Sequence, residues 1–416
     1  MQRELWRETP ASVKLLLIIS FMMNIGFYAL IPYLTLYLTG SFAWTVAMAG
    51  MLLGVRQFSQ QGLAFLGGMV ADKFGYKGTM VLGTAVRATG FLLFAFCHET
   101  WHFIGAAILS GLGGALFEPA GAAAFAILTP EKIRKEVFAF RNVLSNIGIV
   151  GSQIIGIVLS TLDFFWLSVF AGGIYYVSAL VTFFFLPAVQ SGNQQGSMAS
   201  SIGLIFRDKP FIRYTLILIG YYYIYMQMFL GIPQFTEDLL NSKTYVGTVL
   251  ATVSVSIILF QMKVTHWLEN YNQRFTLIGI GALIMGMGLF LFSFASSLWM
   301  LLFDVFIFAL GTMVSMPYLV DMVPRFAPKE HIGAYYGFNG YSLAIGGSVG
   351  TTLGGWVYDM GKATHMPWLP WSICLLVGGI VAWNLYRMEF RVGGQFYEET
   401  LPQNAVTNQA PVRLNK

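Results

Sequence analysis

Long runs of apolar residues alternate along this chain with short polar connections. Residues 15–38 and 276–297 are apolar on nearly every helical face, without the apolar–polar alternation typical of strands in a membrane barrel. A helix needs about 20 apolar residues to cross the hydrocarbon core of a bilayer. The pattern therefore predicts about twelve transmembrane helices, at residues 13–38, 45–71, 78–97, 101–127, 137–160, 165–187, 211–233, 244–265, 275–296, 298–321, 333–358 and 369–390.

The composition excludes a soluble protein. Of the 416 residues, 56% are hydrophobic and only 10% are charged, and the mean hydropathy is +0.66. A soluble domain has about 25% charged residues, which cover its surface in water. The first apolar run is too long for a cleavable signal peptide and leads directly into a second run. We therefore predict an all-α membrane protein.

Lysine and arginine are distributed unevenly between the two sets of connections. Alternate loops and both tails hold twenty of the 24 basic residues, whereas the opposite loops hold only Lys243 and Lys362. Positive loops remain on the cytoplasmic side, so both termini are predicted to be cytoplasmic and the number of spans to be even. The net charge of +5 follows from this bias. The sequence has no basic face with interleaved aromatic residues, which is the pattern that would indicate nucleic-acid binding.

The chain contains an internal repeat with an offset of 198 residues. The offset superposes Gly113 on Gly311, Pro119 on Pro317, Pro130 on Pro328, Phe140 on Phe338, Gly148 on Gly346 and Gly156 on Gly354. We predict two pseudo-symmetric six-helix bundles at 1–188 and 211–390, a cytoplasmic linker at 189–210 and a cytoplasmic tail at 391–416. Two halves of the same orientation, related by an axis along the membrane normal, are typical of transporters.

The connection between the second and third predicted spans, residues 68–77, reads Gly-Met-Val-Ala-Asp-Lys-Phe-Gly-Tyr-Lys. A glycine at the reversal permits a tight turn. The aspartate falls at a helix C-terminus, where the helix dipole disfavours an anion, so a neighbouring helix N-terminus or Arg141 is expected to compensate it. We predict a conformational motif made of Gly68, Asp72, Lys73, Gly75 and Lys77.

This segment resembles the signature loop of the major facilitator superfamily, whose pattern is Gly-x-x-x-Asp-(Arg/Lys)-x-Gly-x-(Arg/Lys). Residues 54–62, 110–119, 220–223 and 343–347 are similar to the bacterial multidrug-resistance protein H group of drug/proton antiporters. Two positions depart from antiporter motifs: Ser152–Gln153 replaces the usual Gly-Pro pair, and Ala107 replaces an arginine. The resemblance implies a secondary active transporter in the bacterial inner membrane, with proton-coupled efflux of lipophilic or cationic drugs by alternating access.

Ionisable residues inside the spans are the candidates for proton coupling. A charge at the bilayer centre costs about 2.5–3.5 kcal/mol on insertion scales, so such side chains are expected to face the bundle interior. A carboxylate whose proton affinity depends on the distance of its cation is what coupling requires. We predict Glu118 as the proton carrier with Arg87 or Arg141 as its cation; a static ion pair is the alternative. Asp304 is a second buried candidate, for a proton or a cationic substrate, unless it lies at a helix end. Asp321 and Asp359 fall at span ends, where solvation is expected.

A substrate cavity is expected between the halves, near the bilayer midplane. Aromatic rings can stack on planar drugs and attract cations, and polar side chains one helical turn apart share a face. For each such residue, packing or lipid contact is the alternative. The candidate lining residues are Asn24, Tyr28, Arg56, Gln57, Gln61, Tyr222, Tyr223 and Gln227.

Three other functions remain open from the sequence. The same fold could carry a metabolite, sugar or lipid with different or no proton coupling, or act as a receptor without transport. Residues 98–102 read His-Glu-Thr-Trp-His and match the zinc-protease pattern, which requires both histidines on one helix. We expect no metal site, because residues 98–102 fall in the short loop between two predicted spans and no third ligand follows. We also expect no cofactor, because Gly111–Gly114 falls within a hydrophobic helix, where its glycines are expected to permit close packing rather than to bind phosphate. The expected partners are a small-molecule substrate, protons and the lipid bilayer, with the protein acting as a monomer.

Overall fold

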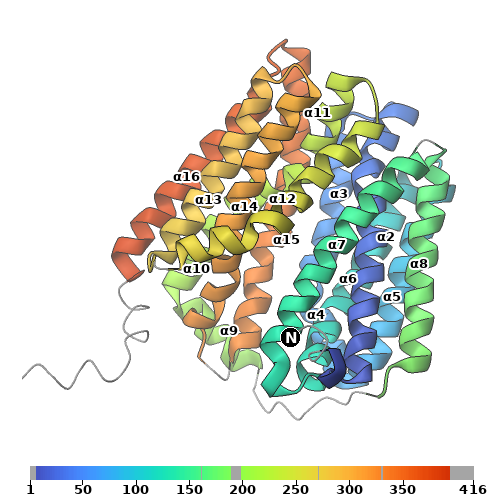
Figure 1. Ribbon diagram of the computed structural model, residues 1–416, viewed down its shortest axis with the longest axis vertical. Helices are drawn as coiled ribbons and strands as arrows, with labels where there is room; N and C mark the ends of the chain where they lie inside the picture. Colours follow the sequence, from blue (N-terminus) through green and yellow to red (C-terminus); the bar gives the residue numbers. More distant parts are fainter. Residues whose placement is uncertain (1–5, 161, 189–197, 270, 329–330, 394–416) are drawn as a thin grey trace, which may run out of the picture.

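The computed structural model describes residues 6–160, 162–188, 198–269, 271–328 and 331–393, and all regular structure in these ranges is helical (Figure 1). The first bundle contains α2 (Ala11–Ser41), α3 (Val46–Gln61), α4 (Ala64–Phe74), α5 (Tyr76–Leu93), α6 (Thr100–Leu128), α7 (Arg134–Ser160) and α8 (Phe164–Phe185). The connecting helix is α9 (Met198–Arg207). The second bundle contains α10 (Lys209–Tyr225), α11 (Gly231–Leu240), α12 (Thr244–Leu268), α13 (Arg274–Leu291), α14 (Leu298–Phe326), α15 (Ile332–Ala363) and α16 (Leu369–Val392). Short 3-10 turns are η1 (Phe94–Phe96), η2 (Glu131–Ile133), η3 (Met226–Met228) and η4 (Phe292–Phe294).

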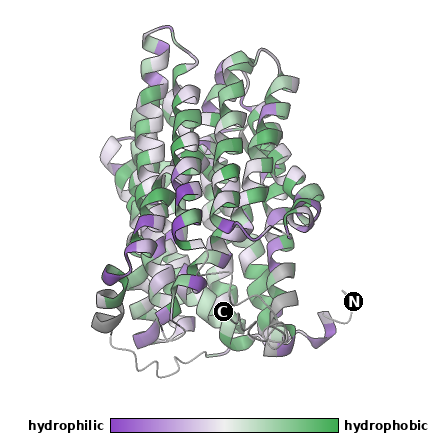
Figure 2. Ribbon diagram, turned by 90° about the vertical axis from the view of Figure 1, so that its left-hand side faces the viewer, coloured by the Kyte–Doolittle hydropathy of each residue, from purple (hydrophilic) through white to green (hydrophobic). Residues whose placement is uncertain are grey.

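The prediction of an all-α membrane protein is confirmed. Ten helical segments within the described ranges are long and apolar enough to cross a membrane. The two remaining predicted spans correspond to the α3–α4 segment and to α15, which fall outside this set. The helices α3 and α4 are separated at Gly62–Leu63, and α15 is rich in glycine and polar residues. Hydrophobic residues extend along most of the helices (Figure 2), and large apolar side chains such as Phe184 and Leu376 are exposed. Lipid would cover such a surface.

The two bundles lie side by side, and their helices pack in the same order (Figure 1). In the first bundle α5 packs on α6 and α8, and α2 packs on α7; in the second, α13 packs on α14 and α16, and α10 packs on α15. We call the end where α2 begins and α16 ends the proximal end, and the opposite end the distal end. The helix order therefore repeats between the bundles.

Close contacts repeat with the offset found in the sequence. A Cβ at Gly83 would meet the backbone of Gly113, and a Cβ at Gly281 would meet that of Gly311. In the same way Gly148 lies against Phe21, and Gly346 against Ile219. Small residues let helix backbones approach closely in membrane bundles. The duplicated sequence thus forms duplicated packing. The boundaries of the bundles, the linker and the tail remain predictions, and residues 189–197 of the linker and 394–416 of the tail lie outside the described residues.

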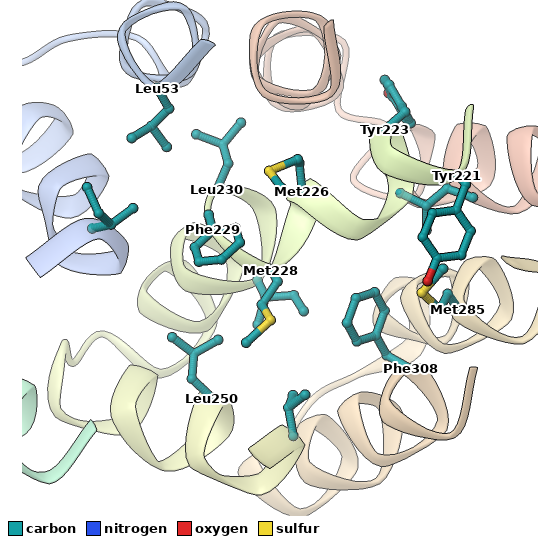
Figure 3. Close-up of a cluster of buried hydrophobic side chains, with 14 of the residues drawn as sticks. Leu53, Tyr221, Tyr223, Met226, Met228, Phe229, Leu230, Leu250, Met285 and Phe308 are labelled. Carbon is teal, nitrogen blue, oxygen red and sulfur yellow. The ribbon is translucent and has the colours of Figure 1, made fainter. Parts of the chain in front are cut away.

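The seventh predicted span is interrupted and longer than expected. It runs through α10 and η3 and continues as α11 to Leu240. Pro233 lies in the first turn of α11, where its missing N–H leaves no helical hydrogen bond unmade. The side chains around the break pack into the buried apolar core (Figure 3). Met226, Met228, Phe229 and Leu230 gather there with Leu53 of α3. This packing joins the break to both bundles.

Hydrogen bonds seal the two bundles together toward the distal end. The carboxylate of Asp359 in α15 accepts bonds from the N–H groups of Val46 at 3.0 Å and Ala47 at 2.7 Å. It therefore caps the start of α3, where unpaired N–H groups and the helix dipole favour an anion. The expectation that Asp359 is merely solvated is thus corrected. Thr39 also donates to Gln234 at 3.2 Å across the bundles.

Candidate functional site

A cavity of about 380 Å³ lies between the two bundles. Its walls repeat with the 198-residue offset, since four residues of α2 and their four counterparts in α10, η3 and the following turn all line it. These pairs are Asn24 and Tyr222, Phe27 and Tyr225, Tyr28 and Met226, and Ile31 and Phe229. The cavity is therefore centred on the pseudo-symmetry axis, where a transporter of this architecture binds its substrate.

A polar network on the first-bundle wall is organised by Gln60. Its Oε1 accepts bonds from Arg56 at 2.7 Å and Arg87 at 3.4 Å, while its Nε2 donates to Glu118. Gln61 donates to the other carboxylate oxygen of Glu118 at 3.1 Å. An amide group joins cations to an anion in this way because its oxygen accepts and its nitrogen donates. The network brings α3, α5 and α6 together at one carboxylate.

The two arginines of this network are buried against an aromatic wall. Arg56 and Arg87 are 5% and 4% exposed, and both guanidinium groups lie over the Phe27 ring, at 5.0 and 5.1 Å from its centroid. A desolvated cation over a ring is stabilised by about 2 kcal/mol. The N–H groups of Arg56 also donate to Gln57 at 2.8 Å. Rings and amides thus stabilise more positive charge than the single nearby carboxylate can neutralise.

Glycines of α6 allow this network to form. A Cβ at Gly113 would overlap the backbone of Arg87, and a Cβ at Gly114 would lie 2.9 Å from the Arg87 guanidinium and from the Gln60 side chain. Gly111 lies in the same way against the backbone of Arg56. The expectation that residues 111–114 permit close packing is borne out by these contacts.

Glu118 has one cation in direct contact and a second that borders the same cavity. Its carboxylate lies 3.7 Å from the Arg87 guanidinium, and its side chain is 39% exposed. Arg141 of α7 lines the same cavity, with its guanidinium 4.6 Å from the Phe125 ring centroid. The counterparts of Arg87, Glu118 and Arg141 in the second bundle are neutral: Met285, Met316 and Asn339. The charged groups of the cavity are therefore concentrated on the first bundle.

The structure separates the predicted lining residues into two groups. Asn24, Tyr28, Arg56, Gln57 and Tyr222 line the cavity. Gln61 instead contacts Glu118 from the end of α3.

Tyr223 and Gln227 do not line this cavity, which corrects their expected position. Gln227 is 3% exposed and donates to the carbonyl groups of Tyr223 at 3.1 Å and Gly350 at 2.9 Å. The two residues share a helix face, as expected, but this face packs on α15. Gln60, Phe27 and Phe229 belong to the site and were not predicted, although Gln60 lies one helical turn after Arg56.

The other acids lie apart from Glu118. Asp304 is 4% exposed in α14, and the structure shows no hydrogen bond to its Oδ2 from any described residue. It does not line the cavity, so the structure does not bring it together with the predicted coupling residues. Asp321 forms ion pairs with Arg274 and, at 3.0 Å, with Arg325, which corrects the expectation of simple solvation.

The signature loop lies at the proximal end. Gly75 joins α4 to α5 with a φ of 88°, the left-handed region that glycine adopts without strain. Asp72 accepts a bond from Tyr76 at 3.0 Å rather than contacting Arg141, which lies over Phe125. Lys73 and Lys77 lie over the rings of Phe74 and Phe183, and Gly68 faces Pro119 of α6.

The residues of the zinc-protease pattern do not share a helix. His98 precedes α6 in an irregular connection, whereas His102 lies in its first turn. Among the residues with described placement, no group of three His, Cys, Asp or Glu side chains could hold a metal ion. The geometry that the zinc chemistry requires is therefore missing at this segment.

Two repeated helical bundles around a central cavity define a transporter. The family model of the Major Facilitator Superfamily matches residues 16–351 and 226–407, and the chain belongs to this superfamily. It is a multi-pass membrane transporter and not an enzyme. Multidrug resistance protein MdtH of Shigella dysenteriae serotype 1 (strain Sd197) is 30% identical over 363 residues, which are 87% of this chain and 90% of that protein. MdtH of Escherichia coli (strain K12 / DH10B) gives the same values.

Solved structures share the fold. A POT family transporter in complex with 5-aminolevulinic acid has a TM-score of 0.77 at 13% identity, covering 91% of this chain and 97% of that one. A point mutant of the nucleoside transporter NupG has a TM-score of 0.72 at 16% identity, covering 91% and 99%. At these identities the similarity establishes the architecture alone.

Proposed function

We propose that this protein is a proton-coupled exporter of lipophilic drugs in the bacterial inner membrane, with its proximal end facing the cytoplasm. The observation that carries the proposal is the carboxylate of Glu118 at the wall of the central cavity, which lies 3.7 Å from the buried Arg87 and is linked through Gln60 to the buried Arg56. The similarity to multidrug resistance proteins supports export of drugs. Both bundles of one chain enclose the cavity, so we propose that a monomer is the working unit.

In the proposed cycle, Glu118 is either protonated, or ionised and paired with a cationic group or a substrate. The ionised carboxylate attracts Arg87, at 3.7 Å, and accepts from Gln60 and Gln61. Protonation removes the charge that holds these groups, so the arrangement of α3, α5 and α6 depends on whether the proton is bound. Differential stability of two conformations is what couples a ligand to a conformational change.

The direct test is transport by the purified protein in liposomes. We expect accumulation of an aromatic dye to rise at least about tenfold when a pH gradient is imposed, because a gradient of one pH unit supplies about 1.4 kcal/mol per proton. Liposomes without protein, and protein with the gradient collapsed by an ionophore, are the controls. Equal accumulation with and without the gradient would contradict proton coupling.

The charge of the cavity favours a different substrate from the cationic drugs that the sequence suggested. Three arginines, Arg56, Arg87 and Arg141, line it with one carboxylate, Glu118. Within the described part of the chain, Arg56 has no ion pair, and its Nε has no hydrogen-bond partner. We therefore propose that lipophilic compounds with an anionic group bind here, with the aromatic walls covering their rings. A metabolite or lipid with an acidic group is the second candidate that this charge supports.

Replacing Arg56 by glutamine tests this assignment. A hydrogen bond to a charged group contributes about 1.5–3 kcal/mol, so binding of anilinonaphthalene sulfonate is expected to weaken about tenfold or more. Binding of the cationic dye ethidium is expected to be unchanged or stronger. Arg391→Gln, at an exposed position of α16, is the matched control. Tighter binding of ethidium than of the sulfonate by the unmodified protein would refute the charge preference.

A further inference from the structure

A second cavity, of about 320 Å³, lies within the first bundle between α2, α5, α6 and α7. We call it the side chamber. Glu118, Arg141, Ser20 and Phe117 line both the side chamber and the central cavity, whereas Gly121 and Ala122 line only the side chamber. The carboxylate at the wall of the central cavity therefore also borders this second space.

The repeat shows that this space is not a necessary result of the fold. At the corresponding positions of the second bundle, large side chains replace the small ones. Leu218 stands where the first bundle has Ser20, and Leu319 where it has Gly121, and both are buried at 0% and 5% exposure. Interiors are close-packed, and sizeable voids in them are few. Small residues at these two positions therefore leave room for the side chamber in the first bundle.

The guanidinium of Arg141 makes the wall of the side chamber polar. A guanidinium group has five N–H donors, and leaving them without acceptors away from water is costly. The contact that the structure shows for this group is the Phe125 ring, and no described residue accepts a hydrogen bond from it. A water molecule occupies about 30 Å³ of liquid, so the side chamber has room for about ten. Water there would solvate Arg141 beside Glu118.

The central-cavity side of Glu118 is already occupied by donors. Gln60 and Arg87 contact one carboxylate oxygen, and Gln61 contacts the other. A carboxylate offers about four acceptor positions, so roughly one remains for another donor. Since 39% of the Glu118 side chain is exposed, that position is within reach of water.

We propose that the side chamber is a water-filled proton compartment that exchanges protons with Glu118 separately from the substrate cavity. A hydronium ion in the side chamber transfers its proton to a carboxylate oxygen of Glu118 and leaves a neutral water; the reverse transfer returns the proton to that water. This inference rests on the proposed role of Glu118 as the proton carrier.

Filling the side chamber tests the inference without any substrate. Gly121→Leu copies Leu319 of the second bundle, and Ala122→Leu fills the same space from the neighbouring position. The probe is the carboxylic-acid infrared band of Glu118 in reconstituted full-length protein, identified by its loss in Glu118→Gln and followed after a step to acidic pH. We expect the band to appear at least tenfold more slowly in both filled variants. Gly173→Leu is the control, since a Cβ at this exposed position meets no atom within 4 Å.

The outcomes separate the two proposals. If the Glu118 band fails to respond to pH in the unmodified protein, the carrier role is refuted. If it responds at one rate in the unmodified, Gly121→Leu and Ala122→Leu proteins, the side-chamber inference is refuted while the carrier role stands. Gly121→Ala is a milder variant, because its methyl group would make ordinary contact with the Phe117 ring at 3.5 Å. If the leucine variants do not fold, Gly121→Ala and Ala122→Val replace them. An unchanged rate of appearance of the Glu118 band in both of these variants would overturn the inference.

Discussion

Glu118→Gln is expected to abolish the dependence of transport on the pH gradient. Glutamine has nearly the same size and still accepts a hydrogen bond from Gln60, but it cannot bind a proton in this pH range. The conformation of the network then no longer depends on pH. Gradient-driven accumulation of a dye substrate in liposomes is expected to fall at least about tenfold, which corresponds to a loss of about 1.4 kcal/mol of driving free energy.

Two further measurements distinguish loss of coupling from loss of folding. Exchange of labelled for unlabelled substrate without a gradient is expected to continue in Glu118→Gln, because the neutral side chain corresponds to the protonated state. Glu99→Gln, at an exposed position before α6, is the matched control and is expected to retain the gradient dependence. Gradient-driven accumulation in Glu118→Gln equal to that of the unmodified protein would remove Glu118 from the mechanism.

Gly50→Leu is expected to prevent closure of the distal end. Gly50 of α3 faces α15 across the two bundles, and a Cβ at this position would overlap the backbone carbonyl of Thr351. A helix backbone cannot move aside as a flexible side chain can, and overpacking typically costs about 1–3 kcal/mol or more. The fraction of molecules whose distal end is closed should therefore fall about tenfold to a hundredfold, and the transport rate should fall with it.

The distance between spin labels at Ser41 and Thr364, at the distal ends of α2 and α15, measures this population. We expect longer distances in Gly50→Leu. Asp359→Ala removes the carboxylate that accepts from the N–H groups of Val46 and Ala47 across the bundles, and is expected to give a smaller shift in the same direction. Gly105→Leu is the control, since a Cβ there meets no atom within 4 Å. An unchanged distance distribution in both test variants would show that the distal contacts do not limit opening.

The sequence led to Glu118, Arg87 and Arg56 because a charge within an apolar span must face the protein interior. It did not lead to Gln60, although this residue joins all three. A glutamine in a helix can face lipid headgroups, a neighbouring helix or a cavity, and composition does not distinguish these positions. The end of α3 at Gln61 and the lack of a side chain at Gly114, which lets α6 approach Gln60 and Arg87 closely, place the Gln60 amide between the charges.

Tyr223 and Gln227 show the opposite case. Their spacing of one helical turn indicated a shared face, and Gln227 does donate to the carbonyl of Tyr223. Helical periodicity gives the face but not the neighbour that it meets. The turn from α10 into η3 directs Tyr222, Tyr225 and Met226 toward the cavity, and leaves Gln227 against α15.

The class of fold, the approximate spans, the repeat and the few charges that require an inward position can all be inferred from the amino-acid pattern alone. These follow from the cost of exposing polar groups to lipid, which acts on each segment independently of its neighbours. The three-dimensional packing was needed to show which charges meet, that a side chamber lies beside Glu118, and that Asp359 joins the bundles at the distal end. Such contacts depend on ångström-scale approaches between distant segments, and the pattern of a single span does not contain them.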